Sequence, residues 1–236
     1  MVEPLFFDPN LKPANQVTLT GDEAKHAVSV RRMRLGEAVA VTNGKGLKLR
    51  GEVIAVERNS MTIGVVEVIE EKLPARQFVL IQALAKGDRD ELAIQAATEL
   101  GVSEIIPWAA SRSVSRWEGA KQKTGRERWQ QIVTEAAKQS LRSFIPQVSE
   151  VIDSKKLAES FDQFAKVLVL DPTGTKSLSS VSIRESGRIA LIVGPEGGIS
   201  AEELEIFSKA EIISLGSNVL RTSTAGPAVL AALTLG

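Results

Sequence analysis

The chain has 236 residues and a mass of 25.4 kDa, enough for one large domain or two small ones around a substantial core. Basic and acidic residues balance at 29 each, so the overall charge indicates no nucleic-acid partner, and any such binding must come from local patches. The absence of cysteine excludes disulfides, thiolate nucleophiles and cysteine-ligated metals, and the single histidine, His26, argues against a histidine metal site. We therefore expect no bound metal.

The start of the chain has no basic-then-apolar leader, and the uncharged apolar runs are shorter than the roughly 20 residues that span a membrane. We expect a cytoplasmic protein without a membrane partner.

Residues 1–72 have the pattern of a small β domain. An amphipathic helix is expected from Thr20 to Gly36, with Ala24, Ala27, Val28 and Met33 on its apolar face. Short strands with turn residues between them favour a small barrel. The strands are predicted at residues 39–42, 47–56 and 61–68.

The pattern changes after a linker at residues 70–74, because near-continuous apolar strands then alternate with helices. This alternation is typical of a parallel sheet covered on both faces. The fold class is therefore α/β, with a small β domain at residues 1–72 and an α/β domain at residues 73–236. Strands are predicted at residues 78–84, 102–108, 166–170, 188–193 and 211–215, and helices at 88–100, 124–141, 154–164, 200–209 and 224–235.

Familiar nucleotide and hydrolase motifs do not occur in the sequence. The G-x-G-x-x-G loop, the P-loop and the G-x-S-x-G elbow are all missing. Asp88, Asp90 and Glu91 have the residue types of metal ligands. They stand at a predicted helix start, however, where carboxylates cap amide groups, and we favour that interpretation.

The most informative segment runs from Ile189 to Ile199, where a buried strand leads into a loop with three glycines and one proline. Glycines let backbone amides approach a ligand closely, and open α/β sheets bind ligands outside the carboxyl ends of their strands. Ser200 is expected to cap the next helix. The alternative is a tight turn that binds nothing.

A second loop follows the next strand and ends at Arg221. Arg221 would place a cation beside a ligand, which suits a phosphate or a developing anion. A surface arginine that pairs with a helix end or a carboxylate is the alternative. Apolar and polar side chains of this loop are expected to surround a ligand: Leu215, Val219, Leu220, Ser217 and Asn218.

Basic residues form two local clusters. The segment from Arg112 to Arg128 is rich in basic residues, and with Trp117 it is predicted to be a flexible phosphate-binding loop with a stacking residue. Arg31, Arg32 and Arg34 form the second cluster, near the end of the first predicted helix. Interaction with the helix dipole on a solvated face is the alternative to RNA contact for this cluster.

Two further residues have competing interpretations. His26 is expected to be structural or to contact RNA rather than to catalyse. Arg142 closes the long predicted helix, where a dipole or dimer-interface role competes with RNA binding.

Five ordered motifs resemble the RsmE family of RNA methyltransferases in the SPOUT superfamily, and the match covers nearly the whole chain. Two of them, LIVGPEGGIS and SLGSNVLRTSTA, are similar to the family's pair of cofactor loops. Ser223 stands where the family usually has Glu, and Gly226-Pro227 interrupts the usual start of the last helix. The other three matches are HAV with VRRMRLG, KGDRDE with ATELGV, and RW with EAAKQSLR and IP.

The resemblance implies an enzyme that transfers a methyl group from S-adenosyl-L-methionine to N3 of one uridine in the 16S rRNA of the small ribosomal subunit. It also implies an N-terminal PUA-like β-barrel that binds RNA and a C-terminal α/β SPOUT domain with a trefoil knot. The active unit would be a homodimer, with each cofactor pocket close to the subunit interface.

We assign catalysis to Arg221, as the cation that stabilises the anion developing at uridine N3. Glu196 is a candidate base, but we favour a loop or ligand-contact role for it, and the proton acceptor stays open. Cofactor binding is assigned to Leu170, Gly194, Pro195, Glu196, Gly197, Gly198, Leu215, Gly216, Val219, Leu220 and Thr222. RNA binding is assigned to His26, Arg31, Arg32, Arg34, Lys86, Arg112, Arg116 and Arg142.

Two alternatives to this function stay open. One is a SPOUT methyltransferase that acts on another rRNA or tRNA nucleoside. The other is a non-catalytic RNA-binding protein with a degenerate methyltransferase domain. The departures from the family pattern at Ser223 and Gly226-Pro227 are the features that support this alternative.

Overall fold

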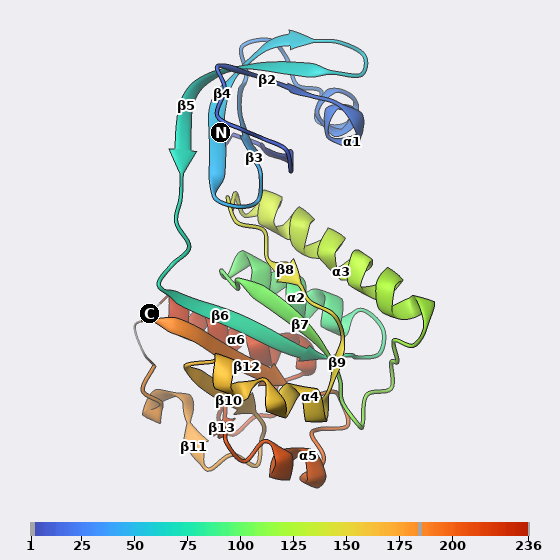
Figure 1. Ribbon diagram of the computed structural model, residues 1–236, viewed down its shortest axis with the longest axis vertical. Coiled ribbons are helices and arrows are strands. Elements are labelled where there is room, and N and C mark those ends of the chain that lie inside the picture. Colours follow the sequence, from blue (N-terminus) through green and yellow to red (C-terminus); the bar gives the residue numbers. More distant parts are fainter. Residues whose placement is uncertain (1–2, 184–185, 236) are drawn as a thin grey trace. The chain divides into compact units, whose positions relative to one another are not determined.

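The computed structural model describes residues 3–183 and 186–235 (Figure 1). The chain divides into two compact units. One unit comprises Met1–Leu73 with Ala137–Ile145, and the other comprises Pro74–Ala136 with Pro146–Gly236.

A five-stranded sheet forms the first unit, in the order β1-β3-β4-β5-β2. Strand β1 is parallel to β3, and the other pairs are antiparallel. The three strands that the sequence predicted are present, whereas β1 and β2 were not predicted because they are too short for a periodic signal. The strands are β1 Leu5–Phe7, β2 Gln16–Leu19, β3 Ala38–Thr42, β4 Leu47–Val56 and β5 Met61–Glu70.

The helix of the first unit is shorter than predicted. Helix α1, Gly21–Lys25, continues as a wide π-helical turn at His26–Val30, and the prediction that it reaches Gly36 is wrong. The N–H of Arg31 donates to the carbonyl oxygen of His26, and Arg32 then adopts a left-handed φ of 55°, which turns the chain out of the helix. The predicted apolar face is confirmed, since Ala24, Ala27 and Met33 are buried.

The second unit is a parallel sheet in the order β11-β13-β10-β12-β6-β7-β8, with β9 also paired to β7. Its strands are β6 Arg76–Ala83, β7 Glu104–Ala109, β8 Gln147–Val148, β9 Ile152–Asp153, β10 Lys166–Leu170, β11 Lys176–Ser177, β12 Gly187–Val193 and β13 Glu211–Ser214. Its helices are α2 Arg89–Glu99, α3 Ala120–Gln139, α4 Ser154–Glu159, α5 Ala201–Ile206 and α6 Thr222–Thr234, and the last residues of α3 belong to the first unit.

Helices cover both faces of this sheet, as the continuous apolar runs predicted. Helices α2 and α6 pack together on one face, and α4 and α5 lie on the other (Figure 1). In β6, Val79 and Ile81 belong to the core under α4 and α5, while Leu80 points to α6. Side chains on both faces of β6 are therefore buried, so the strand lacks the alternation of apolar and polar residues seen in a half-exposed strand.

The register of the central strands brings their carboxyl ends to one level. Leu170, the last residue of β10, pairs with Val193 of β12 and with Ile213 of β13. The two glycine-containing loops singled out in the sequence leave from β12 and β13. Both loops therefore start at the same edge of the sheet.

Helix α3 begins at Ala120, four residues before the predicted start, and ends at Gln139 rather than Leu141. Its end is set by Leu141, which has a φ of 59°. The N–H of Arg142 donates to the carbonyl oxygen of Ala137, and that of Leu141 donates to Lys138, the pattern of a Schellman cap. A leucine in this position gave no stop signal, because glycine is the usual residue there.

None of the helices in the described part of the chain is both long and apolar enough to cross a membrane. The trefoil knot implied by the resemblance stays a prediction.

Candidate active site

A cavity of about 330 Å³ opens at the carboxyl edge of the parallel sheet. Its walls come from the ends of β10 and β12, the loops after β12 and β13, and the first turns of α2 and α6. This volume falls within the range of about 300–1,000 Å³ for small-molecule pockets. The lining residues are Arg89, Leu170, Asp171, Pro172, Val193, Gly194, Pro195, Glu196, Gly198, Ile199, Val219, Leu220, Arg221, Thr222 and Ala225.

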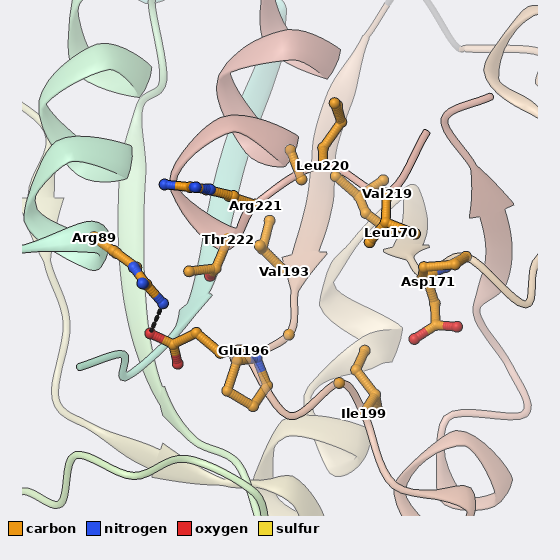
Figure 2. A pocket seen from close by; sticks show the side chains of 15 residues that line it. Arg89, Leu170, Asp171, Val193, Glu196, Ile199, Val219, Leu220, Arg221 and Thr222 are labelled. Atoms are coloured by element: carbon orange, nitrogen blue, oxygen red, sulfur yellow. Dashed lines mark hydrogen bonds and ion pairs between the residues drawn. The ribbon is translucent and has the colours of Figure 1, made fainter. Parts of the chain in front are cut away.

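Charged side chains line one side of the cavity, and apolar side chains lie across from them together with Asp171. Figure 2 shows the side chains of Arg89, Glu196 and Arg221 on one side, and those of Leu170 and Val219 across from them. An arrangement of this kind fits a ligand with one charged end and one flat or apolar end.

A smaller cavity of about 40 Å³ adjoins the first and shares some of its walls. The residues assigned to cofactor binding divide between the two cavities. Gly194, Pro195, Glu196, Gly198 and Thr222 line the larger one, Leu215 and Gly216 line the smaller one, and Leu170, Val219 and Leu220 line both. Asn218 lines the smaller cavity and Arg221 the larger one.

Gly197 is the one residue of the assigned cofactor set that lines neither cavity. It packs instead against the segment after β7. A Cβ atom at Gly197 would lie 3.2 Å from Cβ of Arg112, and Nη1 of Arg112 donates to the carbonyl oxygen of Gly197 at 3.2 Å. The close approach between these two segments explains the glycine.

Sequence reasoning did not assign Arg89 to the site. The side chain of Glu196 accepts from Nη1 of Arg89 (Figure 2) and from the N–H of Lys86, both at 3.1 Å. Lys86 and Arg89 follow β6, whose carboxyl end lies at the same edge as the two loops, and this topology was the available signal. Asp171, Val193, Ile199 and Ala225 were also not assigned, and the first of these follows β10 directly.

Asp171 is a buried carboxylate of the cavity wall. Its Oδ1 accepts from the N–H of Thr173 at 2.9 Å and from the Thr173 hydroxyl at 2.7 Å. These bonds stabilise the turn after β10.

Glu203 is a buried carboxylate that ties three segments together. It accepts from the N–H and hydroxyl of Ser111, at 2.7 and 2.9 Å, and from the Ser154 hydroxyl at 2.6 Å. With Ser200 it forms the predicted cap as a full capping box. Burial raises the pKa of Glu203, but the hydrogen bonds, led by that from Ser154, bring it below its usual value.

Two of the three acidic residues at the start of α2, Asp90 and Glu91, make contacts within the protein, whereas Asp88, at the N-cap position, makes no side-chain cap hydrogen bond. Asp90 is buried, and its side chain accepts from the N–H groups of Ala85 and Glu91, both at 2.9 Å. Burial raises the pKa of Asp90, and these backbone hydrogen bonds oppose the rise. Glu91 pairs with Arg128. The described residues include no group of three or more side chains placed to hold a metal ion.

In the first unit, the assigned RNA-binding residues differ in exposure. Arg31, Arg32 and Arg34 are exposed, and within the described ranges their side chains make no ion pair. His26 is half-buried with its ring edge-on to Phe6. Arg142 is partly buried, and burial lowers its pKa to about 10, which is still above neutral pH.

In the second unit, Lys86, Arg112 and Arg116 are exposed. Nη2 of Arg116 donates to the carbonyl oxygen of Ser111 at 3.0 Å, so this arginine braces its own loop. The stacking role predicted for Trp117 is wrong, because the ring is only 8% exposed and packs edge-on against Trp129.

The Gly226-Pro227 pair does not interrupt the last helix, since α6 runs through it from Thr222. A Cβ atom at Gly226 would lie 2.8 Å from Leu80 of β6 and 3.3 Å from Val193 of β12. The glycine therefore lets α6 pack closely on the two strands beside the cavity. Ser223, the other departure, lies in the first turn of α6 and lines neither cavity.

Comparison with known proteins adds independent findings. A family model described as an RNA methyltransferase domain matches residues 71–234, and one described as an RNA methyltransferase PUA domain matches residues 19–66. The chain is 36% identical to ribosomal RNA small subunit methyltransferase E of Mycobacterium bovis, over 99% of this chain and 92% of that protein. It is 32% identical to the Bacillus subtilis protein of the same name, over 94% and 91%.

Solved structures show the same fold. The crystal structure of ribosomal RNA small subunit methyltransferase E from Neisseria gonorrhoeae, bound to S-adenosyl methionine, matches with a TM-score of 0.88 and 27% identity. The match covers 99% of this chain and 98% of that one.

Proposed function

Because the chain belongs to the ribosomal RNA small subunit methyltransferase E family, we propose that it methylates 16S rRNA with S-adenosyl-L-methionine, at N3 of one uridine. The observation that carries the proposal is the cavity at the carboxyl edge of the sheet, with Arg221 and Thr222 at the start of α6. The match with the named relatives extends over nearly the whole chain, so the matched region includes both glycine-containing loops.

The cavity residues fit S-adenosyl-L-methionine. Leu170, Val219 and Leu220 supply an apolar surface for the adenine ring, and the polar side accommodates the charged amino-acid end. When bound, this cofactor supplies an electrophilic methyl group on a positively charged sulfur. The chain needs to hold that group in line with the nucleophile and keep water away, and the reaction requires neither metal nor thiol.

Arg221 acts on the target base. Uridine N3 carries a proton that must leave before or during methyl transfer, and the resulting negative charge spreads over N3 and the two flanking carbonyl oxygens. Arg221 is exposed at the rim of the cavity, and no other described side chain bonds to its guanidinium. A cation with its hydrogen-bond donors free is suited to stabilise that anion. The methyl group passes to N3, the sulfur keeps the bonding electron pair, and the N3 proton goes to an acceptor that we leave unassigned.

RNA contact is divided between two regions in this proposal. Residues 1–72 form the RNA-binding domain and residues 73–236 form the methyltransferase domain. Arg31, Arg32 and Arg34 bind phosphates from the first, and the exposed cations Lys86, Arg112 and Arg116 do so from the second. His26 and Arg142, which are less exposed, support these contacts. A ribosomal RNA substrate also implies action in the cytoplasm.

We propose a homodimer as the active unit. A groove of about 370 Å³, lined mainly by apolar side chains, follows α6 and the end of β13, and it shares Leu215, Gly216 and Leu220 with the pocket walls. An apolar surface next to a ligand site suits a subunit interface. Light scattering should give about twice the 25.4 kDa mass of the chain, and Ala232→Glu, on the exposed side of the groove, should give the monomer.

A methyl-transfer assay tests the function. The protein is incubated with labelled S-adenosyl-L-methionine and small ribosomal subunits that lack the native methyl group, and the RNA is digested to nucleosides. Label in 3-methyluridine supports the proposal. Label in another nucleoside would identify that nucleoside as the target instead of uridine N3. A protein that binds the cofactor product but never transfers label to RNA would contradict the enzymatic function.

A further inference from the structure

Gln82 is a polar side chain in the buried part of strand β6, next to the pocket. It is fully buried, and its Nε2 donates to the carbonyl oxygen of Ala83 at 3.2 Å and to Oγ1 of Thr222 at 2.8 Å. Its own Oε1 has no hydrogen-bond partner among the residues that the structure describes. A buried amide with an orphaned oxygen costs free energy, so an apolar residue would stabilise the strand better unless the amide has another use.

The orientation of the amide determines the role of Thr222. The Ala83 carbonyl oxygen can only accept, so the nitrogen of Gln82 must face it, because the flipped amide would bring two oxygens to 3.2 Å. The same nitrogen then donates to the Thr222 hydroxyl, whose oxygen is occupied as an acceptor. The hydroxyl proton of Thr222 finds no acceptor within residues 3–183 and 186–235, while the residue lines the cavity.

We propose that Gln82 is a positioning residue that makes the Thr222 hydroxyl a hydrogen-bond donor to an acceptor atom of the bound cofactor. The proposal rests on the proposed function. Thr222 suits the cofactor better than the RNA base, because it is only 7% exposed within the cavity wall, whereas the neighbouring Arg221 is exposed at the rim. Gln82 itself touches no ligand and acts through Thr222.

Binding of S-adenosylhomocysteine to the full chain, measured by calorimetry, tests the contact of Thr222 with the cofactor and the positioning of Thr222 by Gln82. Thr222→Val removes the donor and should raise Kd about tenfold, whereas Thr222→Ser keeps the hydroxyl and should stay close to the unmodified protein. Gln82→Met should raise Kd severalfold, because no donor then fixes the direction of the Thr222 hydroxyl proton. Gln77→Met makes the same change on the same strand, away from the cavity, and should leave Kd unchanged.

The double variant separates a positioning role from a structural one. In the Thr222→Val background, Gln82→Met should have no further effect on Kd, since its effect passes through the hydroxyl. A full, additive effect there would overturn the proposal, as would an unchanged Kd in Thr222→Val. If the unmodified protein binds no S-adenosylhomocysteine, the proposed function fails instead.

A second variant keeps the test open if Gln82→Met does not fold. Gln82→Glu is nearly isosteric, and its carboxyl group donates only while protonated. As the pH rises and that proton leaves, the group accepts the Thr222 proton and turns it away from the cavity. The ratio of variant Kd to unmodified Kd should therefore rise with pH, and a constant ratio would contradict the proposed role.

Discussion

The two glycine-containing loops of the site differ in how their hydrogen-bonding groups are used. In the first loop, residues 194–200, Glu196 and the Gly197 carbonyl accept from neighbouring segments, and the Ser200 hydroxyl caps α5. In the second loop, residues 215–221, no side chain donates to or accepts from another described residue. The first loop is held by the protein, whereas the side-chain donors of the second have no partner among the described residues.

This difference indicates different roles for the two glycine-containing loops. A loop whose partners all lie within the protein fixes the shape of the cavity before any ligand arrives. A loop with unused donors gains its hydrogen bonds only when a ligand is present. Substitutions in the second loop should therefore change chemistry and binding, whereas those around the first should mainly change stability and geometry.

The largest effect is expected at Arg221. Arg221→Ala should reduce kcat by about 100- to 1,000-fold, because the charge that stabilises the uridine anion is lost. The Kd for S-adenosylhomocysteine should change by less than about threefold, since the guanidinium acts on the base. Single-turnover methyl transfer and calorimetry measure the two quantities. Weakened cofactor binding with normal turnover would instead make Arg221 a cofactor ligand.

The next effect concerns the base of the first loop, at Glu203. Glu203→Ala leaves the N–H and hydroxyl donors of Ser111, Ser154 and Ser200 without their acceptor, at a cost of about 2–3 kcal/mol of unfolding free energy. Urea denaturation measures this change. Glu205→Ala, on the exposed side of the same helix, should cost less than about 0.5 kcal/mol. An equal loss of unfolding free energy in the two variants would show that the buried hydrogen bonds of Glu203 do not contribute to stability.

The same carboxylate predicts a pH dependence. Because the pKa of Glu203 is lower in the folded protein than its usual value, its contribution to stability is complete above the usual pKa. The contribution is lost as the pH falls through the lower folded pKa. The difference in stability between the unmodified protein and Glu203→Ala should therefore narrow in acid, and a difference that stayed constant down to pH 3 would contradict the assignment.

Much of this site was predictable because sequence signals survive where a loop follows a buried strand. The segment after Val193 and the cation at Arg221 were identified from local composition, and both line the cavity. Arg89 was not, because its approach depends on β6 and β12 being neighbours in the sheet, which no local pattern encodes. The role of Gly197 was also hidden, since a glycine next to a ligand and a glycine next to Arg112 look alike in sequence.

The fold shows the same division. The long strands β4 and β5 and the continuous apolar run of β6 were predicted because such patterns need several residues, whereas two-residue strands such as β8 carry no pattern. The early end of α1 follows from a π-helical turn and from the left-handed Arg32, a conformation for which arginine gives no signal.

A smaller effect is expected at Gly197. Gly197→Val places its side chain against Arg112, where even a Cβ atom would be at 3.2 Å, so the segment that carries Arg112 must move. The affinity for a 16S rRNA fragment should fall about fivefold, while the Kd for S-adenosylhomocysteine should stay within about twofold. Filter binding at two salt concentrations checks the first value. A larger loss of affinity for S-adenosylhomocysteine than for RNA would instead support the original assignment of Gly197 to cofactor binding.

The smallest effect is expected at Glu196, although it lies in the cavity wall. Its ion pair with Arg89 joins side chains that are 24% and 45% exposed, and such pairs contribute about 0–1 kcal/mol. Glu196→Gln keeps an oxygen to accept from Lys86 and Arg89, so kcat and the Kd for S-adenosylhomocysteine should each change by less than about fivefold. The pH–rate profile should keep its shape, because a carboxylate engaged by two donors holds the first loop rather than accepting the N3 proton. A loss of more than about 100-fold in kcat, together with a weaker dependence of the rate on pH, would identify Glu196 as the base. The first loop would then also contain a catalytic residue.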